Sequence, residues 1–171
     1  IINNLIYANS GIIIGGAPAF SLECLVKNNE IYAVRFGINV QGSNTNIVDN
    51  KVYSSETGIT VSQGSDTTVE NNIVYASSLG IQVNSVSNPV VTNNKVECTS
   101  ANPLIQETNG IIFGGSFSGG VIKDNEINLP DAGVVGVPKR AICIAGVSNI
   151  GILNNTIYRS THGITIFNGA N

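Results

Sequence analysis

The stretch Val69-Glu70-Asn71-Asn72-Ile73-Val74-Tyr75, followed by Gly80-Ile81-Gln82-Val83, decides the fold, because similar pairs of segments recur along the whole chain. The second asparagine of each copy marks one repeat, and the copies are Asn4, Asn29, Asn50, Asn72, Asn94, Asn125 and Asn155. Their spacings are 25, 21, 22, 22, 31 and 30 residues. Repeats of roughly 20 to 50 residues indicate a stacked solenoid, so we number seven coils, one to seven, by these asparagines.

A second marker follows in each coil, and its members are Gly11-Ile12, Gly37-Ile38, Gly58-Ile59, Gly80-Ile81, Gly110-Ile111, Ala141-Ile142 and Gly163-Ile164. Between the markers side chains alternate with the two-residue period of strands, as in residues 57–62, and no segment has a helical period. This pattern therefore predicts three short strands in each coil. Three strands and about 22 residues per coil predict an all-β parallel β-helix that spans 1–171 as a single domain.

The repeats resemble those of the right-handed parallel β-helix family of pectate-lyase type, in which N-N-x-I is followed after a gap by G-I-x-V. The resemblance covers all seven coils. It implies the fold, and it implies that the sheet of the Gly-Ile strands lies under a polysaccharide cleft in a protein found outside the cell or on a cell or virion surface. It does not imply one activity, because one fold hosts many functions.

The register predicts what each row of side chains does. The isoleucine after each glycine faces the interior, and the aligned asparagines bond to one another from coil to coil, about 4.8 Å apart. All five tyrosines fall in one outward row, three residues after an aligned asparagine. We expect this row to form an aromatic stack, with contact to sugar or to another subunit as the alternative.

Composition excludes several classes of protein. Hydrophobic residues make up 42% of the 171 residues and charged residues 11%, which is typical of a folded chain. A formal net charge of −3 without basic runs argues against nucleic acid and against a membrane surface, and no apolar run is long enough to span a bilayer. Three cysteines without metal-type spacing predict buried thiols, no metal and no cofactor. Because the chain lacks methionine and starts inside a repeat, we expect it to be a segment of a longer protein.

Departures from the repeat point to one face. Coils five and six each hold about eight extra residues between the asparagine and the Gly-Ile position, and coil one carries an extra loop at about 15–21. All three insertions flank the Gly-Ile strand. In solenoids, insertions on one side mark the working face.

Uncharged polar residues form the predicted floor of this face. They are Asn39, Gln41, Thr60, Ser62, Gln82 and Asn84. Such a grid suits the hydroxyl groups of a polysaccharide, although an ordinary solvated strand face has the same composition. The floor contains no aspartate or glutamate, so the paired carboxylates of common glycoside hydrolases are missing from it.

A cluster of charged residues leaves a catalytic function possible. Coils five to seven place Glu107, Lys139, Arg140, Arg159 and His162 just before the Gly-Ile strand. Elimination from a uronic acid needs a base for the C5 proton and cations that neutralise the carboxylate. In this hypothesis Lys139, Arg140 and His162 supply these groups, Glu107 orients them and Arg159 contacts substrate. Their alternative role is that of solvated turn residues.

Three functions therefore stay open. The first is a segment that binds, and in its full-length form processes, an extracellular polysaccharide. The second is a polysaccharide lyase or related uronate-processing enzyme, and the third is a rigid spacer of a tailspike or adhesin. A homotrimer is an assembly that the sequence leaves open.

Overall fold

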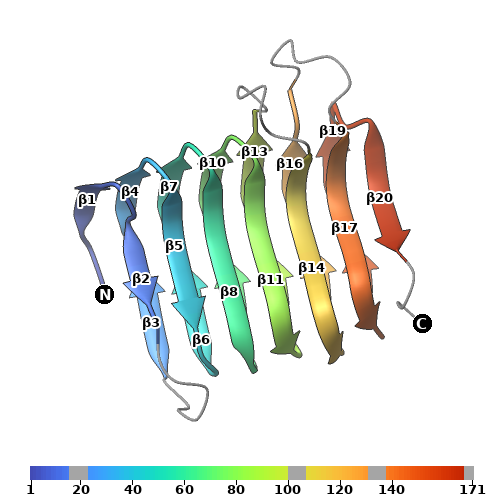
Figure 1. Cartoon of the computed structure of the whole chain (residues 1–171), viewed down its shortest axis with the longest axis horizontal. Helices are drawn as coiled ribbons and strands as arrows, with labels where there is room; N and C mark the ends of the chain where they lie inside the picture. Colours follow the sequence, from blue (N-terminus) through green and yellow to red (C-terminus); the bar gives the residue numbers. More distant parts are fainter. Residues whose placement is uncertain (16–22, 100–106, 131–137, 168–171) are drawn as a thin grey trace.

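The computed structural model describes residues 1–15, 23–99, 107–130 and 138–167, and within these ranges it consists of strands and turns (Figure 1). The strands form three parallel sheets whose members recur once per coil, so the chain is a solenoid. The prediction of a parallel β-helix is confirmed. The described residues include no helix long and apolar enough to cross a membrane.

The three sheets follow one another along each coil. The tyrosine sheet contains β1 (Leu5–Ala8), β4 (Glu30–Ala33), β7 (Lys51–Ser54), β10 (Ile73–Ala76), β13 (Lys95–Cys98), β16 (Glu126–Asn128) and β19 (Thr156–Tyr158). The long-strand sheet, which carries the Gly-Ile row, contains β2 (Ile12–Ile14), β5 (Phe36–Gln41), β8 (Thr57–Ser65), β11 (Leu79–Ser87), β14 (Thr108–Ser118), β17 (Lys139–Ser148) and β20 (His162–Phe167). The third sheet contains β3 (Cys24–Lys27), β6 (Thr45–Val48), β9 (Thr68–Glu70), β12 (Val90–Thr92), β15 (Val121–Lys123) and β18 (Gly151–Leu153).

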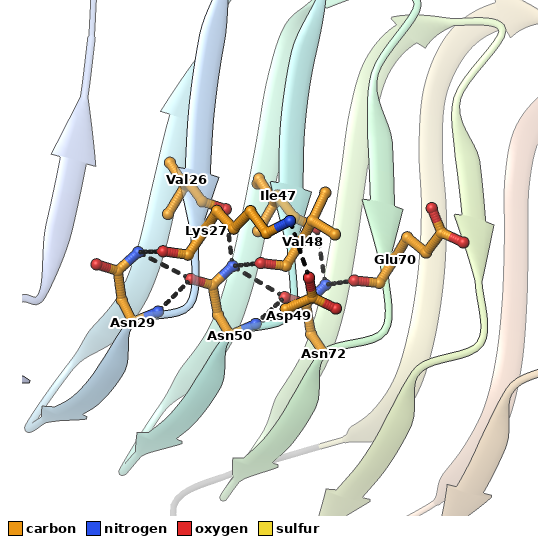
Figure 2. Close-up of polar contacts among 9 residues, drawn as sticks. All are labelled: Val26, Lys27, Asn29, Ile47, Val48, Asp49, Asn50, Glu70 and Asn72. Carbon is orange, nitrogen blue, oxygen red and sulfur yellow. Dashed lines mark hydrogen bonds and ion pairs between the residues drawn. The ribbon is translucent and has the colours of Figure 1, made fainter. Parts of the chain in front are cut away.

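Aligned asparagines join successive coils where the third sheet turns into the tyrosine sheet (Figure 2). The Oδ1 of Asn72 accepts hydrogen bonds from the backbone N–H and the Nδ2 of Asn50, at 2.9 and 3.0 Å. The Nδ2 of Asn72 in turn donates to the carbonyls of Ile47 and Glu70 and to Oδ1 of Asn94. The contacts between neighbouring asparagines recur at every step from Asn4 to Asn155, which confirms the predicted asparagine row.

The residue before each aligned asparagine has a left-handed backbone. Asn71, for example, has φ of 55°. The full row is Asn3, Asn28, Asp49, Asn71, Asn93, Asp124 and Asn154. Asparagine and aspartate are the non-glycine residues that tolerate this conformation best. The doubled polar pair therefore has two functions, because the first residue makes the turn and the second fastens it to the next coil.

The interior is a stack of branched aliphatic side chains. Ile38, Ile59 and Ile81 are fully buried in the long-strand sheet, and Ile31 and Val52 are fully buried in the tyrosine sheet. The predicted inward column of isoleucines is confirmed from Ile12 to Ile142. The last member of the column, Ile164 on β20, is 52% exposed.

Lack of space explains the glycine row. A Cβ atom added to Gly58 would lie 2.2 Å from Cγ1 of Val74 and 2.7 Å from the carbonyl oxygen of Gly80. The corresponding neighbour of Ala141 is Ile157, a half-buried side chain in the end coil.

The tyrosine row stacks in part. Tyr7, Tyr32, Tyr53 and Tyr75 form successive face-to-face pairs with ring centroids 4.9, 4.7 and 5.1 Å apart. Tyr158 lies outside this stack, because Glu97 and Asn128 occupy the two intervening coils and bond to each other. The stack stabilises adjacent strands by about 0.5–1.5 kcal/mol per pair.

The three cysteines are free thiols, and the prediction that they are buried is confirmed for two of them. Cys98 and Cys143 are buried, whereas Cys24 is only half-buried. Burial raises the pKa of the Cys98 thiol far above its ordinary value, with a further rise from the charge of Glu97. This thiol stays protonated and packs as an apolar group.

Substitution of Gly58 by alanine is expected to destabilise the solenoid by about 1–3 kcal/mol, because the new methyl group overlaps Val74 and a backbone carbonyl. Gly163→Ala is the matched control, since a Cβ there meets nothing within 4 Å. Urea unfolding followed by circular dichroism measures both. Equal stabilities of the two variants would show that the close approach at Gly58 is unimportant.

Asn72→Ala is expected to remove about 1–3 kcal/mol for each buried group left without a partner, because the backbone N–H of Asn50 loses its acceptor and the Nδ2 of Asn50 keeps only the carbonyls of Val26 and Val48. Asn4→Ala is expected to cost only about 1 kcal/mol, since its Oδ1 accepts no bond and its remaining bonds lie at an exposed end. Denaturant midpoints of the two variants check the difference, and a cost at Asn4 equal to that at Asn72 would contradict it.

Candidate functional site

The outer face of the long-strand sheet places the six predicted floor residues in register. Asn39, Thr60 and Gln82 are opposite one another on β5, β8 and β11. One pleat further along, Gln41, Ser62 and Asn84 form a parallel row. All six side chains are half-buried, and neighbouring strands lie about 4.8 Å apart. The structure thus brings the six residues together as a grid of two rows and three coils.

These six side chains make no hydrogen bond to the part of the chain that the structure describes. None has a hydrogen-bond partner within residues 1–15, 23–99, 107–130 and 138–167. The hydroxyl oxygen of Thr60 is in addition covered from solvent. A covered polar atom without a partner is uncommon in folded proteins. The grid therefore presents unused donors and acceptors on a fixed backbone.

Each insertion that was predicted to border this face lies between two strands that the structure describes. Two lie between the tyrosine sheet and the long-strand sheet, before β14 and before β17, and one follows β2. Most of their residues, 16–22, 100–106 and 131–137, lie outside the described residues. The strands that flank them confirm that the insertions adjoin both ends of the long-strand sheet.

Arg140 forms the charged corner of the same face. Its Nη1 donates to Oε2 of Glu107 at 2.5 Å, and its guanidinium carbon lies 5.1 Å from the ring centroid of Phe167. The Arg140 side chain is only 13% exposed, whereas that of Glu107 is 51% exposed. The structure therefore brings these two predicted residues into one ion pair, with Phe167 as an unpredicted third member.

Cys143 lies near this ion pair, on the outward row between Ile112 and Thr165, and is only 2% exposed. Burial raises the pKa of its thiol, which Arg140 partly offsets and Glu107 reinforces through their charges. Cys143 is thus an outward residue that is nonetheless covered.

His162 lies beside Arg140 in register, on the next strand. Its Nδ1 is 3.1 Å from the hydroxyl oxygen of Thr161. That hydroxyl accepts the N–H of Lys139 at 2.8 Å and donates to the carbonyl of Lys139 at 3.0 Å. Since the single hydroxyl proton is given to the carbonyl, the contact with Nδ1 is a hydrogen bond only when Nδ1 is the donor. Neutral His162 then has its free lone pair on Nε2.

Lys139 and Arg159 occupy different surroundings from Arg140. Lys139 is 4% exposed, and its Nζ donates to the carbonyl of Pro130 at 3.1 Å. Arg159 has a left-handed backbone in the exposed turn that follows β19. The structure therefore groups Glu107, Arg140 and His162, and it places the ammonium of Lys139 against the coil-six turn.

No group of three or more histidine, cysteine, aspartate or glutamate side chains in the described part of the chain is arranged to hold a metal ion. The carboxylate of Glu107 is paired with Arg140. The chemistry that this corner offers is that of a base and a paired cation.

A cavity of about 450 Å³ lies away from the predicted floor, along the edge of the tyrosine sheet that leads to the long-strand sheet. Tyr32, Tyr53 and Tyr75 line one side, and Glu97 lies at the coil-five end. The faces of these rings are covered by each other, so the cavity presents ring edges and hydroxyls rather than stacking surfaces. The Tyr32 hydroxyl bonds to Glu30 at 2.7 Å, which raises the pKa of Tyr32 to about 12.

Sequence reasoning missed this cavity, and it also missed the contribution of Thr161. A cavity at a turn depends on the turn conformation and gives no repeat signal. Thr161 does have a repeat signal. It lies two places before the glycine marker, in the position that Lys139 and Thr108 occupy in the two preceding coils.

Comparison with known proteins places the chain in a family. A model of the family described as "Right handed beta helix region" matches residues 1–137. No curated protein matches the sequence. Among solved structures, one titled "Crystal Structure of the periplasmic alginate epimerase AlgG" is similar, with 15% identity and a TM-score of 0.46. The match covers 84% of this chain and 39% of that one, so this chain spans about two fifths of its length. On the family match, the chain belongs to the right-handed β-helix family.

Proposed function

We propose that the outer face of the long-strand sheet binds a polysaccharide. The observation that carries this proposal is the grid of Asn39, Gln41, Thr60, Ser62, Gln82 and Asn84, whose six uncharged side chains have no partner among the described residues. The sheet supplies hydrogen-bonding groups there that the described residues do not satisfy.

The chemistry of the grid fits sugar hydroxyls. Each sugar hydroxyl both donates and accepts, and so does each amide of the grid, which are those of Asn39, Gln41, Gln82 and Asn84. The rows run across the strands, along the axis of the solenoid, so an extended glycan chain meets one side chain per coil at about 4.8 Å intervals. Ile112 and the half-buried face of Ala145 extend the rows with apolar surface on which C–H groups of a sugar can rest.

Other ligand classes fit this grid less well. Nucleic acids bind through several lysine or arginine contacts to phosphate, and the six floor residues carry no charge. The core of a stable protein interface is usually apolar and aromatic, whereas the centre of this face is amide and hydroxyl. A role outside the cell or on a cell or virion surface belongs to the same proposal. The rigid spacer and the homotrimer remain predictions.

Replacement of Gln82 and Asn84 by alanine is expected to weaken polysaccharide affinity about tenfold or more, because each lost hydrogen bond contributes about 1 kcal/mol. A panel of neutral and acidic polysaccharides, measured by affinity electrophoresis and calorimetry, identifies the ligand first. Thr68→Ala with Thr92→Ala is the matched control, since both threonines are half-buried on the third sheet. Unchanged affinity in the floor variant, or an equal loss in the control, would rule out this face.

A second candidate function is β-elimination from a uronate-containing polysaccharide. The observation that favours it is the hydrogen-bond pattern around Thr161, which directs the free lone pair of His162 to Nε2. In this mechanism Nε2 takes the C5 proton, the C4–C5 double bond forms and the C4–O bond breaks, with the leaving oxygen protonated by solvent.

The cationic groups have unequal roles in this second candidate. Arg140 is one strand away from His162 and retains N–H groups beyond the one given to Glu107, so it neutralises the carboxylate of the uronate. Glu107 orients Arg140. Lys139 acts through its backbone, which holds Thr161, and Arg159 binds substrate beyond the end of β19.

The elimination reaction is followed by ultraviolet absorbance of the unsaturated product. His162→Gln is expected to lower the rate by about a hundredfold or more, as for the loss of a general base. Thr161→Val is expected to lower it while Thr161→Ser preserves it, because only serine keeps the hydroxyl. Arg35→Gln, which changes an exposed ion pair in coil two, is the control. Absence of product with every acidic glycan, or full activity of His162→Gln, would exclude the mechanism.

A further inference from the structure

We propose that Gln63 and Ser85 form a third row of the polysaccharide site, where they hydrogen-bond to the sugar units that lie over coils three and four. This inference rests on the proposed function, because it adds two residues to the same face of the long-strand sheet. It is carried by a separate observation, the backbone conformation of these residues, which the proposed function does not use.

Both residues have a backbone conformation that their side chains disfavour. Gln63 has φ of 56° and Ser85 has φ of 53°, in the left-handed region. Elsewhere in the part of the chain that the structure describes, the non-glycine residues with positive φ are asparagine or aspartate, with Arg159 as the exception. Asparagine and aspartate tolerate this region, whereas other L-residues meet a steric penalty there. Residues held in such conformations cluster at functional sites.

Glycine occupies the same place in the neighbouring coils. Gln63 and Ser85 come directly after the second row of the grid, and the residues that follow this row in coils two, five and six are Gly42, Gly115 and Gly146. All three glycines have positive φ, and the values for Gly115 and Gly146 are 95° and 72°. Glycine adopts such conformations without steric cost. The corner of the sheet therefore requires backbone freedom, and the two side chains at coils three and four are not needed to form it.

This corner lies beside the grid. Gln63 follows Ser62 and Ser85 follows Asn84, and Ser62 and Asn84 are opposite each other on neighbouring strands. In a regular strand the next residue would face the interior. Gln63 and Ser85 are instead exposed, and the inward alternation resumes one residue later, where Val86 is fully buried. The left-handed residue thus adds a second consecutive residue to the outer side of its strand.

The two side chains have hydrogen-bonding groups to offer. Neither makes a hydrogen bond within residues 1–15, 23–99, 107–130 and 138–167. The amide of Gln63 both donates and accepts, and so does the hydroxyl of Ser85. Glycine in the next coil leaves room for this hydroxyl, because a Cβ atom added to Gly115 would lie 2.5 Å from Oγ of Ser85. The third row thus offers the same uncharged chemistry as the grid beside it.

The third row runs parallel to the two rows of the grid. Since Ser62 and Asn84 lie on neighbouring strands, the residues that follow them are about 4.8 Å apart along the axis of the solenoid. A glycan over this face then meets three polar side chains per coil at coils three and four, and two at coil two. Because a few precisely placed polar groups give a binding site its specificity, the third row makes coils three and four the more selective part of the path.

The test replaces both residues by glycine, which suits the left-handed backbone and removes only the side chains. Gln63→Gly combined with Ser85→Gly is expected to weaken polysaccharide affinity about tenfold or more, as for the loss of two hydrogen bonds. The urea midpoint of this variant is expected to stay the same or to rise, because glycine relieves the conformational penalty at positive φ. Calorimetry with the polysaccharides of the panel, from a neutral glucan to polygalacturonate, measures affinity, and circular dichroism measures unfolding.

Asn71→Gly combined with Asn93→Gly is the matched control. Both asparagines are exposed and left-handed, with φ of 55° and 54°, and they lie where the third sheet turns into the tyrosine sheet. This variant also loses two polar side chains at left-handed positions of neighbouring coils. It is expected to keep full affinity for the same polysaccharide, and a loss equal to that of the first variant would show that the effect does not come from contact with the ligand.

The other outcomes separate this inference from the proposed function. If the Gln63 and Ser85 variant keeps its affinity while Gln82→Ala with Asn84→Ala loses it, the floor binds polysaccharide and the third row does not. If the Gln63 and Ser85 variant is clearly less stable than the unmodified chain, the two residues serve the fold, and the inference is wrong. If the unmodified chain binds no polysaccharide of the panel, the proposed function fails and this inference fails with it.

Discussion

From Asn29 to Asn155, the side-chain oxygen of each aligned asparagine accepts two N–H groups from the coil before it, and the rest of the structure depends on this contact. It occurs at a buried turn where the backbone has no sheet partner, so without it several polar groups would be left unsatisfied. Because the contact joins equivalent atoms, it also fixes how one coil sits on the next. All three sheets inherit their register from it, including the long-strand sheet on the other side of the solenoid.

The sequence predicts most of this architecture because each rule is repeated seven times. The inward isoleucines, the glycine at the close approach and the asparagine row are each supported by copies, and the copies agree. Two exceptions have physical reasons. Tyr158 leaves the tyrosine stack since Glu97 and Asn128 separate it from Tyr75, and Ile164 is exposed on β20, the outermost described strand of its sheet.

The charged corner is predicted less well, because its contacts occur once and are not repeated. Sequence spacing places Arg140 beside His162, and the strands confirm this. Spacing does not show that Phe167 lies against the guanidinium or that the ammonium of Lys139 turns to Pro130, since both depend on side-chain conformations at one place. Thr161 likewise acquires its significance only from three hydrogen bonds to one oxygen atom.

The two candidate functions are neighbours on one sheet. The polar grid occupies coils two to four, and the ion pair of Arg140 with Glu107 closes the same face at coils five and six. A glycan that lies along the grid would therefore reach the charged corner at one end of its path. In the two proposals taken together, the uncharged grid would supply affinity and the corner would discriminate among sugars by charge.

The outward rows have a further consequence for how such a protein changes over generations. Each coil contributes one residue to each row, and its backbone bonds are the same whichever residue that is. An exchange of Gln82 for another polar residue alters one position of its outward row and leaves the positions before and after it where they are. Duplication of a whole coil would add one residue to each outward row and would keep the distance of about 4.8 Å between neighbouring strands. Each position of the outward rows can thus be substituted independently of the others.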